Sequence, residues 1–199
     1  HNLLNALQKE RAGEGLRPAA YLLENVAMQY NSGVNAAMGQ ESFDTIRAML
    51  GEPITFDAAA VGSRAHRLRN WWTNLTASPV ANAVLQAVKR PTGILVDQVL
   101  EKGWHAPATT EPSKRPFYPC NGPHTPREAL PTLTATVNSW AYRGEHGAGM
   151  LVRADRAVRE PNPEEREQLL GFEPAATAAE GVSTTERHRA LGNSWDINA

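Results

Sequence analysis

Apolar and polar residues follow one another along the first 75 positions in an order that predicts helices and strands in turn. Leucines at helical spacing predict a helix over residues 1–9, and a second apolar stripe predicts another over 41–50, with Gly51 placed as its C-terminal cap. Three shorter apolar runs have the length of strands and lie within residues 19–26, 54–61 and 63–75. Strands that alternate with helices in this way are typical of an α/β sheet.

The pattern changes in the second half of the chain. Residues 80–103 predict one or two helical pieces, interrupted by Arg-Pro-Thr-Gly at 90–93. Residues 106–131 are rich in proline and lack periodicity, which indicates loops and edge strands in a linker or a recognition surface. Helical periodicity returns behind two capping boxes, Asn162–Glu165, which has proline at the first helical position, and Ser183–Glu186.

Composition narrows the class of protein. The chain has 199 residues, is 41% hydrophobic and has a mean hydropathy of -0.45, as is ordinary for a globular domain. No window approaches the roughly 18 apolar residues of a membrane span, so no membrane partner is expected. One cysteine, Cys120, excludes an internal disulfide framework. Sixteen of the 20 basic residues are arginine, which suits contacts to phosphates and base edges, although a GC-rich coding sequence would give the same bias.

Two polar residues interrupt the first predicted strand. The stretch AYLLENVAM, residues 20–28, places Glu24 and Asn25 at the end of an apolar run that would suit a buried strand. Burying a carboxylate is costly unless it is paired or has chemistry to perform. At the C-terminal end of a parallel strand, with Arg67 and Arg69 on a neighbouring strand, Glu24 would lie where α/β proteins bind ligands. The residues alone leave two interpretations open, a proton donor in a cleft and a structural ion pair.

Other candidate groups are less informative. Cys120 in FYPCNGP could be a nucleophile activated by a nearby cation, or an inert loop cysteine. The six histidines are scattered and lack ligand spacing, so they predict no metal site.

Five segments resemble motifs of the DNA (cytosine-5) methyltransferase family. AYLLENVAM resembles the Glu-Asn-Val motif VI, and residues 54–75, with His-Arg-x-Arg before aromatics and Asn-Leu, resemble motif VIII in the form nearest to the eukaryotic de novo branch. Three more segments follow in the family's order: LPTLTATVNSW resembles motif IX, PEEREQLLGF the stretch before the last helix, and HRALGNSWDIN motif X.

The resemblance implies a Rossmann-like, S-adenosyl-L-methionine-dependent methyltransferase fold of the α/β class, with a small irregular target-recognition region. It divides the chain into residues 1–79, which carry motifs VI and VIII, residues 80–140, which recognise the target and end in motif IX, and residues 141–199, which return to the core with motif X. Family members transfer a methyl group from S-adenosyl-L-methionine to C5 of a cytosine flipped out of double-stranded DNA. A nuclear protein is expected, or a cytoplasmic one if the source is bacterial or viral.

The resemblance also assigns roles to residues. Glu24 would donate a proton at N3 of the cytosine, Asn25 would orient the site, and Arg69, supported by Arg67, would stabilise charge at O2. Motif X would line the cofactor pocket with Asn193, Ser194 and Trp195. Contacts to DNA would come from Thr132, Thr134, Asn138 and Arg143.

Two family motifs are absent from this sequence. The glycine-rich motif I and the Pro-Cys nucleophile motif should both precede Glu24, whereas Pro119-Cys120 follows motif VIII and is interpreted as part of the target-recognition region. The chain is therefore expected to be the later half to two-thirds of a catalytic domain, with an incomplete cofactor site and no activity alone. A missing N-terminal part or a second methyltransferase subunit would complete it. The alternative is a non-catalytic accessory subunit.

Overall fold

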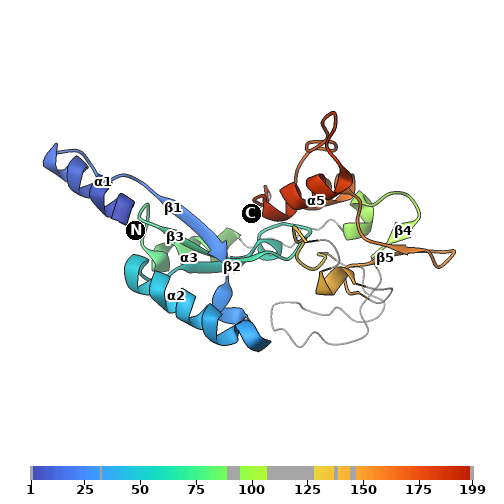
Figure 1. The fold of residues 1–199 in the computed structure, drawn as a ribbon, viewed down its shortest axis with the longest axis horizontal. Coiled ribbons are helices and arrows are strands. Elements are labelled where there is room, and N and C mark those ends of the chain that lie inside the picture. The colour runs from blue at the N-terminus through green and yellow to red at the C-terminus, as the bar shows by residue number, and fades with distance from the viewer. Residues whose placement is uncertain are drawn as a thin grey trace. The chain divides into compact units, whose positions relative to one another are not determined.

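The computed structural model contains both helices and strands, as an α/β class requires (Figure 1). It describes residues 2–31, 33–88, 95–106, 128–136, 139–143 and 147–197. Two compact units divide the chain: unit 1 is His1–Phe56 with Leu68–Val88, and unit 2 is Asp57–Arg67 with Lys89–Ala199. The division into three parts by motif stays a prediction. None of the described helices is long and apolar enough to cross a membrane.

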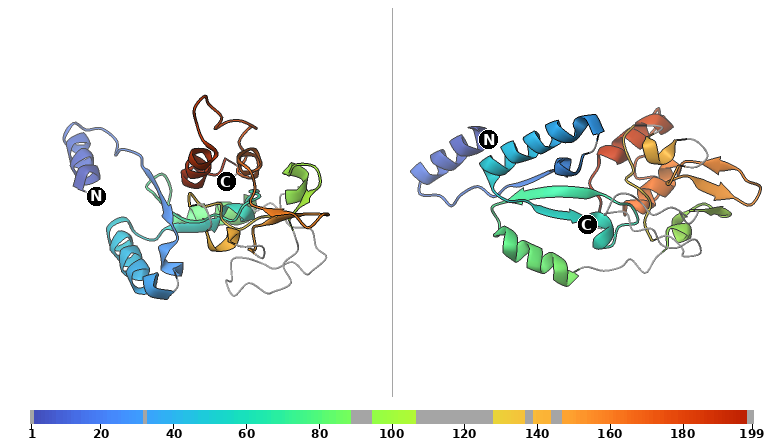
Figure 2. Two further views of the ribbon diagram at one scale, coloured as in Figure 1. Left: turned by 45° about the vertical axis from the view of Figure 1, so that its right-hand side comes forward. Right: turned by 90° about the horizontal axis from the view of Figure 1, so that it is seen from below.

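Unit 1 is built on a three-stranded sheet in the order β1-β3-β2. Its main elements are α1 (Asn2–Gly13), β1 (Leu22–Val26), α2 (Ala36–Leu50), β2 (Ile54–Asp57), β3 (Leu68–Thr73) and α3 (Ser78–Val88), with short 3-10 turns at Met28–Tyr30 and Gly33–Asn35. Helix α2 runs beside the strands, whereas α1 extends away from them (Figure 2). Gly51 ends α2 with a φ of 82°, a left-handed conformation that glycine adopts without strain, so the predicted cap is confirmed.

The prediction of a buried, parallel first strand is wrong. Strand β1 pairs with β3 in the antiparallel direction, and Leu22, Leu23 and Val26 are 42–49% exposed. Glu24 lies in the middle of β1 rather than at its end. The apolar run of the sequence indicates a strand, but pairing direction and burial depend on distant segments that a local pattern does not encode.

A small aromatic core holds unit 1 together. Trp72 on β3 is 1% exposed and packs with Phe43 of α2 and with Met28. The indole nitrogen of Trp72 donates a hydrogen bond of 3.0 Å to the carbonyl of Gly51, which satisfies the one polar atom of a buried ring. Helix α2 approaches the turn at Met28 so closely that a side chain at Gly39 would overlap the Met28 carbonyl.

Unit 2 contains the larger core. Its elements are η4 (Val96–Val99), β4 (Trp104–His105), η5 (Trp140–Tyr142), β5 (Leu151–Arg153), β6 (Val158–Arg159), α4 (Pro163–Leu169) and α5 (Thr184–Asn193), and the strands form an antiparallel sheet in the order β4-β5-β6. Twelve of the described residues gather in one buried cluster, with members from α4, α5, β5 and the segment at Leu130. Burial of one such leucine contributes roughly 1.5–3 kcal/mol to stability.

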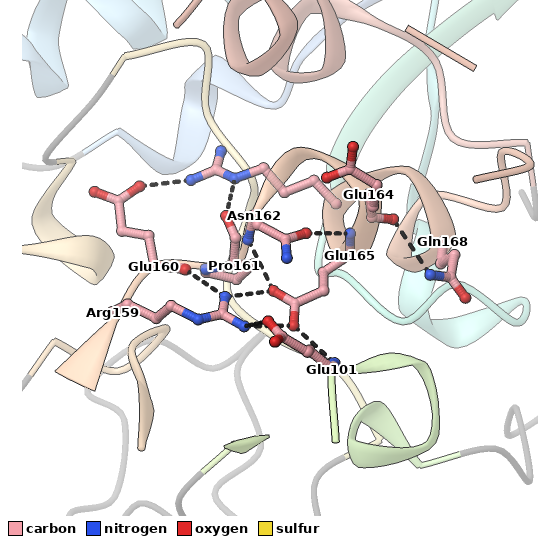
Figure 3. A network of polar contacts seen from close by, with 9 residues as sticks. Glu101, Arg159, Glu160, Pro161, Asn162, Glu164, Glu165 and Gln168 are labelled. Atoms are coloured by element: carbon pink, nitrogen blue, oxygen red, sulfur yellow. Dashed lines mark hydrogen bonds and ion pairs between the residues drawn. The ribbon is translucent and has the colours of Figure 1, made fainter. Parts of the chain in front are cut away.

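Both predicted capping boxes are confirmed. At the start of α4 the Glu165 nitrogen donates 2.8 Å to Asn162 Oδ1, and the Asn162 nitrogen donates 2.8 Å to Glu165 Oε2. Ser183 and Glu186 form the same reciprocal bonds before α5. Figure 3 shows that Glu165 also accepts a two-point contact from Arg159, at 2.6 and 2.8 Å, and a hydrogen bond from the Glu101 backbone. This buried carboxylate therefore joins the helix start to β6 and to the segment at Glu101.

The segment Asp57–Arg67 leaves the sheet and belongs to unit 2. Asp57 Oδ1 accepts hydrogen bonds from the Ala59 and Arg67 nitrogens, at 3.1 and 2.7 Å, and Asp57 Oδ2 lies 2.8 Å from His66 Nδ1. The second predicted strand consequently ends at Asp57 instead of reaching residue 61, because that side chain caps a 3-10 turn at Ala58–Ala60. The far end of the segment bonds to Leu130, since the His66 nitrogen donates 2.8 Å to its carbonyl.

Candidate active site

Strand pairing brings Glu24 and Arg69 together. In the β1–β3 register Glu24 lies opposite Trp71 and Val26 lies opposite Arg69, so Glu24 and Arg69 are diagonal neighbours on one face of the sheet. Arg69 Nε lies 2.5 Å from Glu24 Oε1. The two side chains are only 12% and 17% exposed, respectively. A carboxylate and a guanidinium are thus held in contact on a half-buried sheet surface.

An aromatic side chain flanks this pair. Trp71, opposite Glu24 on the neighbouring strand, stacks on Phe56 of β2 with the two ring centroids 5.8 Å apart and the planes inclined by 12°. A flat apolar surface beside a carboxyl group and a guanidinium has the composition of a site for a planar, polar ring.

A second polar cluster lies on the opposite face of the sheet. Asn70 is fully buried, and its amide exchanges two hydrogen bonds with the Gln29 amide, at 2.8 and 3.0 Å. The Thr55 hydroxyl donates a third, at 2.8 Å, to Asn70 Oδ1. Sequence reasoning missed these residues. The only signal was the position of Asn70 two residues before Trp72, because alternation along a strand places both side chains on the same face.

The side chain of Asn25 is engaged with its own strand. Asn25 Oδ1 accepts a hydrogen bond of 2.7 Å from the Val26 backbone nitrogen. Asn25 lies opposite Asn70 in the register, and side chains alternate along a strand, so Asn25 and Glu24 lie on opposite faces of the sheet. Its assigned role in orienting the site stays a prediction.

Arg67 makes its contacts within unit 2. Its Nη1 donates a hydrogen bond of 3.3 Å to the carbonyl of Gly192, near the end of α5, and its backbone nitrogen donates to Asp57. The side chain is buried. Arg67 therefore links the motif VIII segment to the motif X helix, which is a positioning contact.

The motif X residues assigned to the cofactor follow Gly192. Asn193 and Trp195 are exposed, and Trp195 retains 54% of its surface. Ser194 is half-buried and donates its hydroxyl proton to the Leu191 carbonyl at 2.7 Å. An exposed indole with a neighbouring amide fits the stacking and hydrogen bonding of an adenine ring, whereas the Ser194 hydroxyl serves the helix end.

The residues assigned to DNA fall in unit 2 where the structure describes them. Thr134 donates its hydroxyl proton to the Thr136 carbonyl at 3.0 Å, Thr132 is half-buried, and Arg143 is exposed. Asn138 and Cys120 lie outside the described residues. Within the described part of the chain, no three histidine, cysteine, aspartate or glutamate side chains gather to hold a metal ion.

Buried charges in unit 2 serve helix packing. Glu167 of α4 accepts from Arg187 of α5 at 2.8 Å, and bonds from Thr177 and Arg187 hold the pKa of its carboxyl below the usual range against the opposing effect of burial. His188 is buried beside Arg166 and Arg187, and desolvation, reinforced by these two cations, lowers the pKa of its imidazole to about 4. His188 is therefore neutral at physiological pH.

Comparison with solved structures identifies the fold. The chain resembles the Dnmt2 methyltransferase of S. pombe, with a TM-score of 0.54 and 17% identity over 99% of this chain and 66% of that one. The chain has a methyltransferase fold. The Entamoeba histolytica methyltransferase EhMeth matches with a TM-score of 0.50 and 13% identity, over 92% of this chain and 60% of that one. A mutant of Spodoptera frugiperda DNMT2 matches with a TM-score of 0.50 and 15% identity, over 90% and 63%.

These similarities confirm the resemblance at the level of the fold. The chain spans about two-thirds or less of the length of the structures that it matches. No protein-family model matches the chain, and no curated protein matches it. The nearness of motif VIII to the de novo branch stays a prediction.

Proposed function

We propose that this chain supplies the charge-stabilising part of a DNA (cytosine-5) methyltransferase active site. The observation that carries the proposal is the contact between Glu24 and Arg69 on adjacent strands of a methyltransferase fold. A purely non-catalytic accessory subunit would have no need of a half-buried carboxyl group and guanidinium next to a flat aromatic surface.

The chemistry of cytosine explains why both groups are needed. C5 attacks a methyl donor only after a thiolate has added to C6, and the displaced electron pair then spreads over C5, N3 and O2. Glu24, in its protonated form, would donate a hydrogen bond at N3, and Arg69 would stabilise the developing charge at O2. A base that enters the site would separate the ion pair seen in the free chain, so each group would exchange its partner for one edge of the ring.

The roles of residues in unit 2 are proposals of the same kind. S-adenosyl-L-methionine would supply the methyl group, and the exposed Trp195 and Asn193 would hold part of it. The exposed Arg143 would contact the phosphates of double-stranded DNA. The thiolate would come from a segment with a Pro-Cys motif, carried on the same polypeptide or on a second subunit, since neither that motif nor motif I precedes Glu24 in this sequence.

The test is transfer of a labelled methyl group to cytosine in duplex DNA. The chain alone should transfer none. Mixed with the segment that carries the two missing motifs, it should be active, and Glu24→Gln or Arg69→Ala should lower the rate by on the order of 10²-fold or more.

The matched control is Glu41→Gln, because Glu41 is an exposed carboxylate on α2 of the same unit. Its rate should equal that of the parent chain. Full activity of the Glu24→Gln mixture would refute the role of the acid, and methyl transfer by the chain alone would refute its dependence on another segment.

A further inference from the structure

Two of the three motif X residues assigned to the cofactor lie on the surface. Asn193 and Trp195 are exposed, and the hydroxyl of Ser194 between them donates to the Leu191 carbonyl. Helix α5 ends at Asn193, and Ser194 is already extended, with a φ of -72° and a ψ of 166°. Since exposed side chains do little to fix their own backbone, the placement of this tripeptide depends on how its two ends are held.

The residue before the tripeptide is held by two other segments. Arg67 Nη1 donates a hydrogen bond of 3.3 Å to the Gly192 carbonyl. The backbone of Thr134 and Ala135 lies so close that a Cβ at Gly192 would overlap it. The end of α5 is thereby fixed against the motif VIII and motif IX segments.

The residue after the tripeptide is held by a buried hydroxyl. Ser63 has no exposed surface, Asp196 is 8% exposed, and the hydroxyl and the carboxylate are in hydrogen-bond contact. Ser63 Oγ also lies 3.0 Å from the Ala65 carbonyl. A hydroxyl has one proton and the carboxylate is the stronger acceptor, so Ser63 donates to Asp196. One position further on, the Ile197 nitrogen donates 2.9 Å to the Leu170 carbonyl.

Both anchoring side chains come from one segment, residues 57–67. The Asp57 carboxylate accepts a hydrogen bond of 2.7 Å from the Arg67 nitrogen, which closes the segment on itself. The Arg64 nitrogen donates 3.3 Å to the carbonyl of Leu169, a fully buried residue of the unit 2 core. The two anchors are therefore fastened to the larger core of the same unit.

We propose that the hydrogen bond between Ser63 and Asp196 positions the motif X tripeptide for the cofactor. The inference rests on the proposed function, in which Asn193 and Trp195 hold part of S-adenosyl-L-methionine. Ser63 and Asp196 are positioning residues, which fix the end of the tripeptide opposite to the end that Arg67 fixes. A tripeptide held at both ends loses less conformational freedom when the cofactor binds, so the bond raises the affinity.

Stability alone does not account for a carboxylate at position 196. Burial of a carboxylate costs free energy, and a well-packed apolar side chain of similar size would avoid that cost. A hydrogen bond to a charged acceptor fixes both distance and direction, which apolar contacts do not. The pair therefore suits the placement of a neighbouring side chain, here Trp195, better than the filling of a core.

The test is binding of S-adenosyl-L-homocysteine to the whole chain, followed by NMR of the isotope-labelled indoles. The Trp195 signal, identified with Trp195→Phe, should shift as the ligand is added to millimolar concentration. Ser63→Ala and Asp196→Ala should each raise the dissociation constant (Kd) about tenfold. The double variant should bind no more weakly than either single variant, because all three lack the same bond.

Two further variants are the matched controls. Asp196→Asn keeps an acceptor oxygen for the Ser63 hydroxyl and should bind within about twofold of the parent chain. Glu180→Ala removes an exposed carboxylate that precedes α5 and should leave the Kd unchanged. Without ligand, relaxation of the Trp195 indole should show greater mobility in Asp196→Ala than in either control. Asp196→Ala also keeps the test valid if loss of the buried Ser63 hydroxyl unfolds the chain.

Several results would overturn the proposal. These are a Trp195 signal that the ligand does not shift, an unchanged Kd in Asp196→Ala, an equal loss of affinity in Asp196→Asn, and additive losses in the double variant. Methyl transfer is measured separately, on the mixture with the segment that carries the missing motifs. Weaker binding by Asp196→Ala without methyl transfer to DNA by the parent mixture would refute the proposed function and support the positioning role. Methyl transfer with an unchanged Kd would do the reverse.

Discussion

At the scale of single residues, buried polar groups define the two faces of the unit 1 sheet. Glu24 and Arg69 form a contact on one face, in which the proposed base would replace the partner of each group. Asn70 has no exposed surface and makes three hydrogen bonds to two half-buried partners, Gln29 and Thr55. The first arrangement suits chemistry, and the second suits stability, so substitutions on the two faces should have separable effects.

Replacement of Asn70 should destabilise the fold. Asn70→Ala removes three hydrogen bonds and leaves the Gln29 amide and the Thr55 hydroxyl without this partner, at a cost of about 2–4 kcal/mol. Chemical denaturation measures the loss as a shift in midpoint. Asn82→Ala on the exposed surface of α3 is the control and should change stability by less than about 0.5 kcal/mol. Equal midpoints for the two variants would contradict the structural role of Asn70.

His188 should make stability depend on pH. Its pKa is about 4 in the folded chain and near the ordinary value of 6.5 when unfolded, so between these values the unfolded chain binds more protons. The free energy of unfolding is therefore unaffected by His188 above pH 6.5, and it falls by up to about 3 kcal/mol as the pH drops toward 4. Urea denaturation at pH 7.5 and 5 should show a smaller difference for His188→Gln than for the parent chain. An equal difference for the two chains would contradict this role of His188.

At the scale of elements, local signals predicted the helices better than the strands. Capping boxes and a C-terminal glycine act within one helical turn, so the starts of α4 and α5 and the end of α2 could be found from the sequence. The pairing direction and burial of β1 could not be found in this way, because they depend on pairing with β3, which lies in a distant part of the chain. Glu165, Arg166 and Glu167 are three consecutive charged residues, yet all three are buried, since their partners lie outside α4.

Close packing at the end of α5 depends on a glycine. A side chain at Gly192 would overlap the backbone of Thr134 and Ala135, and Arg67 also bonds to the Gly192 carbonyl. Gly192→Ala should therefore lower the free energy of unfolding by about 1–3 kcal/mol. Gly13→Ala at the end of α1, where nothing lies within 4 Å, is the matched control. It should be neutral or slightly stabilising, and a similar loss at both positions would contradict the close approach.

At the scale of the whole molecule, the two units differ in the size of their cores. Twelve described residues form the buried cluster of unit 2, whereas three, Met28, Phe43 and Trp72, form that of unit 1. The acid and the guanidinium lie in the unit with the smaller core, and Arg67 and motif X lie in the other. The candidate site is therefore carried by a unit with little apolar burial of its own.

Hydrogen exchange should separate the two units. Amides of Leu169 and Leu170, in the core of unit 2, should be among the slowest, and amides of β1 and β3 should exchange at least about tenfold faster. NMR or mass spectrometry of the whole chain measures both sets in one sample, and the exposed turn at Asp155–Arg156 gives the fast reference. Equal protection in the two units would contradict the expectation that the small core of unit 1 lowers the stability of that unit.

The candidate site was predictable to the extent that it depends on motifs. AYLLENVAM and the motif VIII segment identified Glu24 and Arg69, and their strands do bring them together. The partition of Arg67 and Arg69 between two units was not predictable, because residues 67 and 69 lie two positions apart in one motif and only tertiary contacts separate them. Asn25 illustrates the same limit, since its amide bonds to the backbone of its own strand.

The register of β1 against β3 has a consequence for mutational tolerance. Glu24 shares a face with Arg69 only because each residue of β1 has a fixed partner, and hydrogen bonds from Tyr21 to Asn74 and from Thr73 to Tyr21 fix the start of the pairing. Insertion or deletion of one residue between positions 21 and 24 would turn the acid to the opposite face. Such a change in length would be as damaging as loss of the carboxylate itself, although every chemical group of the site would still be present.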